Sequence, residues 1–274
     1  MGKKQGPFIQ SLQRATDILN CFTAKEPSLS LAQISQKTGL NINTTRGLVN
    51  TLVHEDLIAH NTQTNTYSLG LFFVAKAHLV HQSWSMNYTE NYLEDIALSY
   101  MKELTEKYAL FSGLQIVKED KIFMVKAIQP NQSHYRITPE LYTPLEAYCT
   151  ASGKLYLQYL SESRQKEELE NIIFKQYTPN TFSNKEKLLE ALGQQKKTLY
   201  ATEFDERDIG IGSFAAPILR TDRQLFGTIS VIAPSQVLKS QQKEICADLI
   251  KAGKQISRQL NLLIDERIYF NGKE

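Results

Sequence analysis

Hydrophobic residues recur at helical spacing through the amino-terminal part of the chain. Four of them predict a first amphipathic helix, namely Leu12, Ala15, Leu19 and Phe22. A second helix is predicted to begin after Ser30, a good N-cap residue, with Gln33 three positions later where a capping box requires it. We expect Gly39 to end that helix.

A third helix is predicted after a short turn. Its buried stripe consists of Ile42, Thr45, Leu48, Val49, Leu52 and Val53. Its outward face then carries Asn43, Arg46, Gly47, Asn50 and His54. Two helices joined by a short turn that contains glycine form a helix-turn-helix, whose second helix can enter the major groove of DNA. Asn, Thr and Arg side chains there can read base edges or hold phosphates.

Two short strands are predicted next, at residues 57–60 and 66–69, around a polar loop. They would form the β-hairpin wing of a winged helix-turn-helix. The alternative to a DNA-binding domain is a small helical packing module that carries a surface hairpin. The helix-turn-helix pattern alone does not decide between the two. The wing favours DNA binding.

Charge is distributed unevenly along the chain. Residues 1–70 hold six basic and four acidic residues, whereas the rest of the chain holds 25 of each. The whole net charge of +2 therefore lies in the predicted DNA-binding part, as binding to a polyanion requires.

The amino-terminal motifs resemble the IclR family of bacterial regulators, through SLQRATDILNCF, LSLAQISQKTGLNINTTRGLVNTL and YSLG. Family members usually carry an arginine where this chain has Gly47, and a glycine inside a helix costs about 1 kcal/mol relative to alanine. Either the helix is locally weak there or the backbone approaches DNA closely, and we expect Arg46 to replace the displaced arginine. The expected DNA-contacting residues are Ser30, Asn43, Thr44, Arg46, Gly47 and Asn50.

The segment LFFVAKAHLVHQSW, residues 71–84, is apolar around most of its helical circumference and needs a partner surface. Docking onto its own chain is one possibility. We favour pairing of two subunits, as in the resembled family, because a palindromic operator calls for a two-fold protein. His78 and His81 are three residues apart without a third ligand, so we expect solvated or interfacial histidines rather than a metal site.

The remaining chain alternates strand and helix patterns. Strands are predicted for ALFSGLQIV and KIFMVKA after a helix that ends near Tyr108, and helices for residues 151–160, 164–173 and 185–197. Strands at 213–219 and 225–233 precede a terminal helix from about Gln236. This order indicates an α+β domain with a mainly antiparallel sheet. The predicted domains are 1–70 for DNA binding, 71–87 as linker helix and 88–274 as the larger domain.

Three blocks extend the resemblance over nearly the whole chain: TPLEAYCTASGKLYL, LYATEFDERDIGIGSFAAPIL and QLFGTISVIAP. The resemblance implies a GAF-like effector domain. Glu203 stands where a shorter Asp is frequent and Ser213 where Cys is frequent, so the size of the pocket and the identity of its ligand do not follow from the family. Ile232 stands where a Ser can occur, which suggests a pocket less suited to a very polar ligand. The implied effector-binding residues are Ile137, Ala151, Ser152, Glu203, Ile211, Ser213 and Ser230.

A helix is predicted to open at Ala151 and Ser152, and its free backbone N–H groups suit a carboxylate. The GxxxxGK[ST] phosphate loop is absent, so Lys154 is interpreted as a solvated or structural lysine rather than an ATP ligand. We therefore expect a small organic acid as effector.

Composition narrows the remaining possibilities. A chain of 274 residues with 42% hydrophobic and 22% charged residues suits two globular domains. Without an apolar run long enough for a signal peptide or a membrane span, we expect a cytoplasmic protein. Cys21, Cys149 and Cys246 lack disulfide or zinc spacing and are expected to be reduced, mostly buried thiols.

The sequence thus predicts a transcription regulator with three partners: operator DNA, a small-molecule effector and a second copy of itself, as a homodimer or a dimer of dimers. No catalytic or metal-binding motif is recognised, and no cofactor is expected. Two alternatives stay open. The carboxy-terminal domain could only dimerise, or it could hold an enzymatic pocket built from Ser, Glu and Lys.

Overall fold

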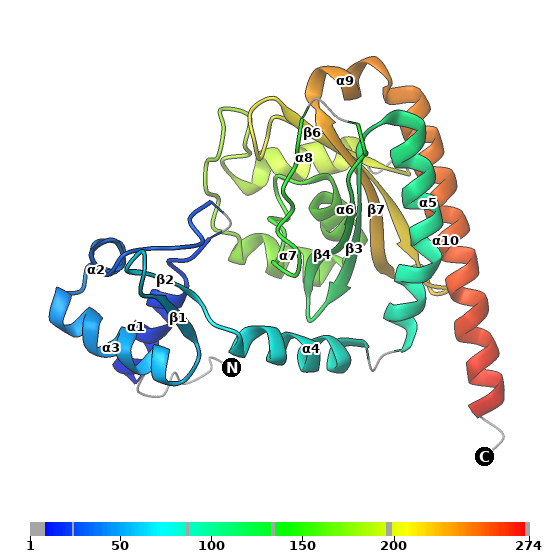
Figure 1. Ribbon diagram of the computed structural model, residues 1–274. Coiled ribbons are helices and arrows are strands. Elements are labelled where there is room, and N and C mark those ends of the chain that lie inside the picture. The colour runs from blue at the N-terminus through cyan, green and yellow to red at the C-terminus, as the bar shows by residue number, and fades with distance from the viewer. Residues whose placement is uncertain (1–8, 24, 86–87, 133–134, 196–198, 272–274) are drawn as a thin grey trace. The chain divides into compact units, whose positions relative to one another are not determined.

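The computed structural model describes residues 9–23, 25–85, 88–132, 135–195 and 199–271 (Figure 1). The chain divides into two compact units, residues 1–86 and 87–274.

The first unit holds the predicted winged helix-turn-helix followed by the helix α4. Its elements are α1 (Gln10–Leu19), α2 (Leu31–Thr38), α3 (Ile42–His54), β1 (Ile58–Asn61), β2 (Thr66–Leu69) and α4 (Phe72–Ser85). Its hydrophobic core is formed by Ile18, Phe22, Leu29, Ile34, Val49, Leu52 and Ile58. The core therefore draws on the helices and the first strand of the wing together.

Local capping explains where α2 and α3 begin and end. The Ser30 backbone N–H donates to Gln33 Oε1 at 2.8 Å and the Gln33 N–H donates to Ser30 Oγ at 3.4 Å, which confirms the capping box. Gly39 closes α2 with φ +69°, in the left-handed region that suits glycine. Asn41 then caps α3 by accepting the Thr44 N–H at 2.9 Å.

Two details of the predicted helical stripes were wrong. Leu12 is 64% exposed, and Ile18 is the buried residue of α1, because the core packs against the carboxy-terminal half of that short helix. Ile42 is 40% exposed as well. As the first residue of α3, it projects its side chain towards the helix start and past the core.

The hairpin wing is confirmed, with Asn61 paired to Thr66 at its tip. The Asn61 side chain accepts the N–H groups of Gln63 and Thr64, which holds the turn closed. Tyr67 exchanges two backbone hydrogen bonds with Leu29, so the wing is also tied to the segment before α2.

The second unit is an α+β domain with a five-stranded sheet of order β4-β3-β7-β6-β5, in which every neighbouring pair is antiparallel. The predicted fold class is confirmed. Its strands are β3 (Phe111–Lys118), β4 (Lys121–Ile128), β5 (Ala201–Phe204), β6 (Ile211–Leu219) and β7 (Leu225–Pro234). Its helices are α5 (Tyr88–Tyr108), α6 (Ala151–Tyr159), α7 (Glu162–Asn171), α8 (Lys185–Gln195), α9 (Ser235–Ser240) and α10 (Gln242–Asn271).

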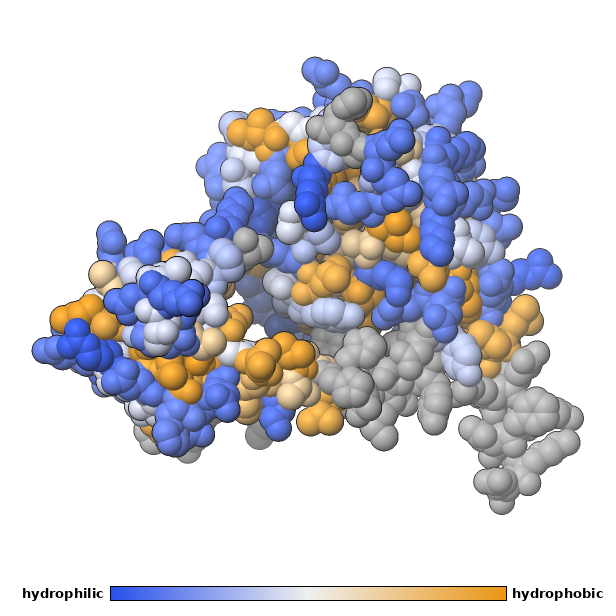
Figure 2. Space-filling model, in the orientation of Figure 1, coloured by the Kyte–Doolittle hydropathy of each residue, from blue (hydrophilic) through white to orange (hydrophobic). Residues whose placement is uncertain are grey.

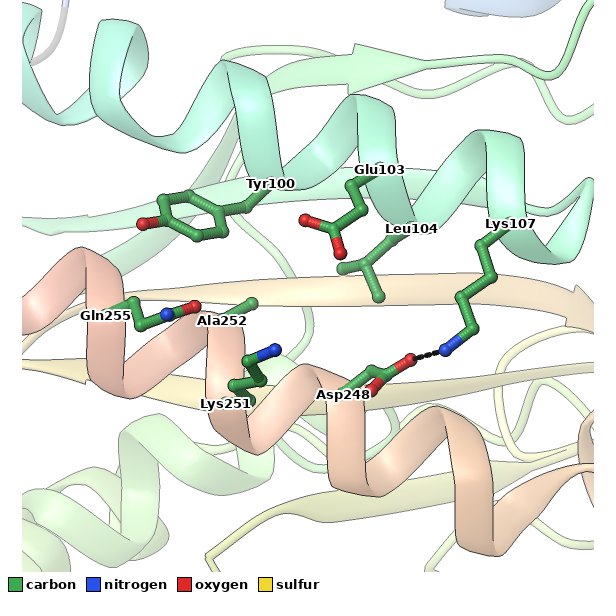
Figure 3. Close-up of a pocket in the computed structure, with 8 residues that line it drawn as sticks. All are labelled: Tyr100, Glu103, Leu104, Lys107, Asp248, Lys251, Ala252 and Gln255. Carbon is green, nitrogen blue, oxygen red and sulfur yellow. Dashed lines mark hydrogen bonds and ion pairs between the residues drawn. The ribbon is translucent and has the colours of Figure 1, made fainter.

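Helices cover both faces of this sheet. α5 and α10 lie side by side along one face, and α6 packs on the other against β5, β6 and β7 (Figure 1). Figure 3 shows the seam between α5 and α10, where Lys107 pairs with Asp248 at 2.5 Å. The Tyr108 hydroxyl also donates to Asp248, at 2.7 Å. Hydrogen bonds from Lys107 and Tyr108 lower the pKa of Asp248.

Two elements of this unit differ from the sequence prediction. The strand β5 was missed although it is as long as β1 and β2, because the loop that joins it to β6 is longer than the loop of the wing and gives no clear hairpin signal. The terminal helix was predicted as one element, whereas the backbone leaves the helical conformation at Gln241 and divides it into α9 and α10.

The capping box should contribute measurably to the stability of α2. Ser30→Ala removes the side-chain acceptor for an otherwise unpaired N–H and is expected to destabilise the helix by about 1 kcal/mol. Hydrogen exchange of the α2 amides in the full chain measures this, with Ser30→Asp as a control that keeps the cap. Unchanged protection in Ser30→Ala would show that tertiary packing alone holds α2.

Candidate functional sites

The outward face of α3 is the candidate DNA-contacting surface. Asn43, Arg46, Gly47, Asn50 and His54 are all exposed, as predicted from the periodicity. Among the described residues, the Arg46 guanidinium has one polar partner, the Asn43 side chain at 3.5 Å, and no acidic partner. Its charge is therefore available to an incoming phosphate or base.

Ser30 and Thr44 are less free than these residues. The Ser30 hydroxyl donates to Gln33 Oε1 at 2.9 Å as well as accepting a backbone N–H, so a DNA contact would have to share a hydroxyl already used in capping. Thr44 is half-buried, and its N–H is taken by Asn41.

Gly47 does not interrupt α3. The helix runs unbroken through this position, and a Cβ added there would meet no atom within 4 Å. Packing within the protein therefore does not require glycine at 47. Both explanations given by the sequence, a locally weak helix and close approach of the backbone to DNA, stay predictions.

A cluster of buried polar side chains lies between α6 and the sheet. Gln115 is its hub: its Nε2 donates to Ser230 Oγ at 2.9 Å, and its Oε1 accepts from Thr228 at 2.7 Å and from Ser152 at 3.1 Å. Thr228 also donates to the Ser152 hydroxyl, at 2.9 Å. Each of these four residues is at most 4% exposed, so we call them the α6 cluster.

The start of α6 adjoins this cluster. Thr150 is the N-cap and accepts the Gly153 N–H at 3.1 Å, while the Ala151 N–H makes a long contact of 3.4 Å to Ser213 Oγ. Gly153 is required here, because a Cβ would come within 2.5 Å of the Ala147 backbone. For the Ser152 N–H, the described residues offer no acceptor.

Glu203 faces Ser213 across the β5–β6 pair. It is 4% exposed, and its Oε2 has no hydrogen-bond partner among the described residues. Burial, together with repulsion from Glu206, raises the pKa of Glu203 from 4.5 to about 8. At neutral pH this side chain is mostly protonated and can donate a hydrogen bond.

The sequence left open whether Lys154 is solvated or structural, and the structure selects the second interpretation. It is 1% exposed, and its ammonium pairs with Glu206 Oε1 at 2.6 Å. Burial raises the pKa of Glu206, and the Lys154 charge opposes this shift. Removing either partner would leave an unpaired buried charge.

The structure brings together five of the seven sequence-predicted effector residues, which surround the α6 start: Ala151, Ser152, Glu203, Ser213 and Ser230. The other two are half-buried. Ile137 lies in the segment between β4 and α6, where its carbonyl accepts from Gln129, and Ile211 begins β6. Gln115 and Thr228 were missed, although Thr228 and Ser230 alternate along β7 in the manner of residues on one face.

The cysteines are free thiols, as expected. Burial raises the pKa of Cys149 and of Cys246 to about 12, so neither is a nucleophile at neutral pH. In the described part of the chain no group of three metal-ligating side chains occurs, while the side chains of His78 and His81 lie outside the described residues. Of the helices described, none combines the length and the apolar character needed to cross a bilayer.

Comparisons with known proteins agree over nearly the whole chain. The regulator XynR of Escherichia coli is 26% identical over 255 residues, which cover 93% of this chain and 98% of that protein. The regulator TtgV of Pseudomonas putida is 27% identical over 264 residues, covering 94% and 93% of the two chains.

Solved structures show the same fold. The Thermotoga maritima IclR structure matches with a TM-score of 0.68 at 21% identity, covering 93% of this chain and 100% of that one. An IclR homolog from Microbacterium hydrocarbonoxydans, complexed with 4-hydroxybenzoate, matches with a TM-score of 0.67 at 16% identity, covering 92% and 99%.

Two family profiles match separate parts of the sequence. The IclR helix-turn-helix domain matches residues 11–62, and the domain described as bacterial transcriptional regulator IclR C-terminal matches residues 76–258. The chain therefore belongs to the IclR family of DNA-binding bacterial transcription regulators.

Proposed function

We propose that this regulator binds its operator as a dimer and that a small organic acid, bound at the start of α6, changes its affinity for that operator. DNA binding follows from family membership. The observation that carries the finer proposal is the buried set of hydrogen-bond donors where α6 meets β5 and β6. Such a set costs free energy to bury unless a partner satisfies it.

Three donors of this set are open to a ligand. The Ser213 hydroxyl accepts the Ala151 N–H, but its proton has no acceptor among the described residues. The Ser152 N–H lies at the positive end of α6. Protonated Glu203 adds a third donor beside Ser213. Neutral donors and a helix N-terminus suit a carboxylate without any arginine.

Apolar neighbours limit the rest of the ligand. Ile232 is half-buried and lies opposite Ser213 in the β6–β7 pair, on the face that α6 covers. The relative crystallised with 4-hydroxybenzoate, and the p-hydroxybenzoate hydroxylase transcriptional activator of Acinetobacter baylyi, 22% identical over 238 residues, support including aromatic hydroxy acids among the candidates. We assign Ile137 and Ile211 to the apolar wall.

Ligand binding acts on DNA affinity through the relative energies of two conformations of the protein. Operator affinity can change only by the ratio of the ligand's affinities for those two states. We place this regulation of DNA binding in the cytoplasm. We assign the buried Ser, Glu and Lys side chains to ligand binding and to structure rather than to catalysis.

The helix α4 is the proposed pairing surface. Val74 is 67% exposed and Leu79 is 53% exposed in the single chain. Figure 2 shows apolar side chains over the first part of this helix. An isolated helix with so much exposed apolar surface requires a partner, and a second subunit also supplies the two-fold symmetry of a palindromic operator.

Pairing of two subunits through α4 can be tested by introducing charged side chains on its apolar surface. Val74→Lys with Leu79→Lys should convert a dimer to monomers, since burying two ammonium groups in an apolar interface is costly. Light scattering at micromolar concentration reports the mass, with Lys76→Glu as a control for altered charge on the same helix. An unchanged dimer in the double variant would place the pairing surface elsewhere.

Arg46 is the proposed anchor of specific DNA binding, with Asn43, Thr44, Gly47, Asn50 and Ser30 around it. Arg46→Ala should weaken binding to an operator selected from random DNA by about 1 to 3 kcal/mol, if the guanidinium contacts a base. Titration at fixed salt measures this, with Arg164→Ala as a control in the second unit. Full affinity in Arg46→Ala would remove this residue from the readout.

The acid site is tested by calorimetry of the full chain against small carboxylic acids, including 4-hydroxybenzoate. Ser213→Ala should weaken binding of the best acid by about 1.5 to 3 kcal/mol, the usual loss of a hydrogen bond to a charged group. Affinity should also fall as the pH rises through about 8, because ionised Glu203 repels a carboxylate.

Glu203→Gln is the matched control, since its neutral amide should flatten that pH dependence. A ligand whose affinity ignores both substitutions would lie at another site. Finding no ligand in a broad panel would favour a domain that only dimerises.

A further inference from the structure

The strand β6 continues beyond its neighbour β5. β5 pairs only with the first part of β6, from Gly212 to Ala215. From Ala216 onward, no strand of the described chain pairs with that edge of β6. Pro217 lies in this free stretch and has no N–H to offer to another strand.

The helix α10 covers this unpaired edge of β6. Gly253 approaches β6 so closely that a Cβ would come within 2.7 Å of the Pro217 carbonyl oxygen. One turn later the Ser257 hydroxyl accepts the Leu219 N–H at 2.9 Å, and one turn after that Asn261 Nδ2 donates to the Leu219 carbonyl at 3.0 Å. These bonds fix the end of β6 against α10.

A cavity of about 340 Å³ opens beside this fixed edge. Its apolar wall is formed by Tyr159 at the end of α6, by Leu199 and Leu219, and by Ile250 of α10. This volume falls within the range of about 300 to 1,000 Å³ that small-molecule sites occupy. No residue of this cavity belongs to the α6 cluster.

Three cations line the same cavity. Arg220 and Arg223 belong to the turn between β6 and β7, and Lys254 projects from α10. Among the described residues none of the three has a salt-bridge partner, and no acidic side chain lines the cavity. The nearby Asp222 is occupied in the turn, where its Oδ1 accepts the Gln224 N–H at 3.0 Å.

Arg223 stands at a position of the turn whose backbone conformation does not favour arginine. This residue has φ +64°, in the left-handed region that glycine and asparagine occupy with least strain. A turn of this shape does not need arginine. The charge of Arg223 also reaches the cavity wall, where it opposes the rise in the pKa of Tyr159 that burial causes.

We propose that this cavity is a second ligand site, distinct from the acid site at α6, and that it binds a small organic anion carrying two negative charges on an apolar body. The guanidinium groups and the ammonium would hold the charged end, since arginine matches carboxylate and phosphate oxygens with paired donors. The apolar wall would cover the body of the ligand.

Phenyl phosphate is a suitable probe, because it joins a dianion to an apolar ring. Calorimetry on the full chain should show it binding more tightly than inorganic phosphate, which lacks the ring, and benzyl alcohol, which lacks the charge. Arg223→Gly and Lys254→Gln should each weaken its binding by about tenfold. Higher salt should weaken it as well, because these cations are exposed.

The variants are chosen so that folding does not confuse the result. Arg223→Gly relieves the strained backbone, so the midpoint of thermal unfolding should stay unchanged or rise. Lys251→Gln, on α10 but in the groove shared with α5, is the matched control and should bind the probe as the parent chain does.

Three outcomes would overturn the proposal. Equal affinity in the parent, Arg223→Gly and Lys254→Gln would exclude these cations. Loss of phenyl phosphate binding in Ser213→Ala would place the probe at the α6 site, whereas failure of the α6 proposal alone would leave binding here intact. No binding of the probe, with dissociation of the oligomer in Arg223→Gly, would assign the cations to contact with a second copy of the chain.

Discussion

The central strand β7 imposes the constraint on which the second unit depends. Its side chains alternate between two buried faces, and the two faces differ in kind. Ile229 and Val231 face α5 and α10 and pack there without polar partners, whereas Thr228 and Ser230 face α6 and need hydrogen bonds. Because a buried hydroxyl is costly when unpaired, the side chains packed against Thr228 and Ser230 must supply donors and acceptors.

Gln115 meets this requirement from the neighbouring strand. It bonds Thr228, Ser152 and Ser230 together, and thereby sets the position of α6 on the sheet. The start of α6 is thus fixed by side chains from β3, from β7 and, through the Ala151 N–H, from β6. The same geometry leaves the Ser152 N–H and the Ser213 hydroxyl proton without acceptors in the described chain. The arrangement that pairs the buried polar side chains therefore also leaves two donors for the proposed ligand.

Unequal strand lengths shape the opposite end of the sheet. Since β5 is only four residues long, α10 must cover the rest of the β6 edge, and it does so with Gly253, Ser257 and Asn261 at intervals of one turn. A helix cannot fill the space of a strand completely. A cavity remains beside the helix, and the two arginines of the adjoining turn line it.

The sequence by itself determined most of the elements and their kind. Period and capping placed the helix-turn-helix at Ser30, Gln33 and Gly39, because these signals act over a few neighbouring residues. Apolar runs bounded by turns likewise placed the long strands of the second unit, and the order of elements indicated its α+β class.

Tertiary structure decided what depends on distant residues. The four residues of β5 form a strand only because β6 pairs with them, and Lys154 is buried only because Glu206 compensates its charge. The hub role of Gln115 requires β7 and α6 to be brought beside it. Spacing along the sequence does not reveal contacts between residues that are far apart in the chain, because the packing of the whole sheet decides which segments meet.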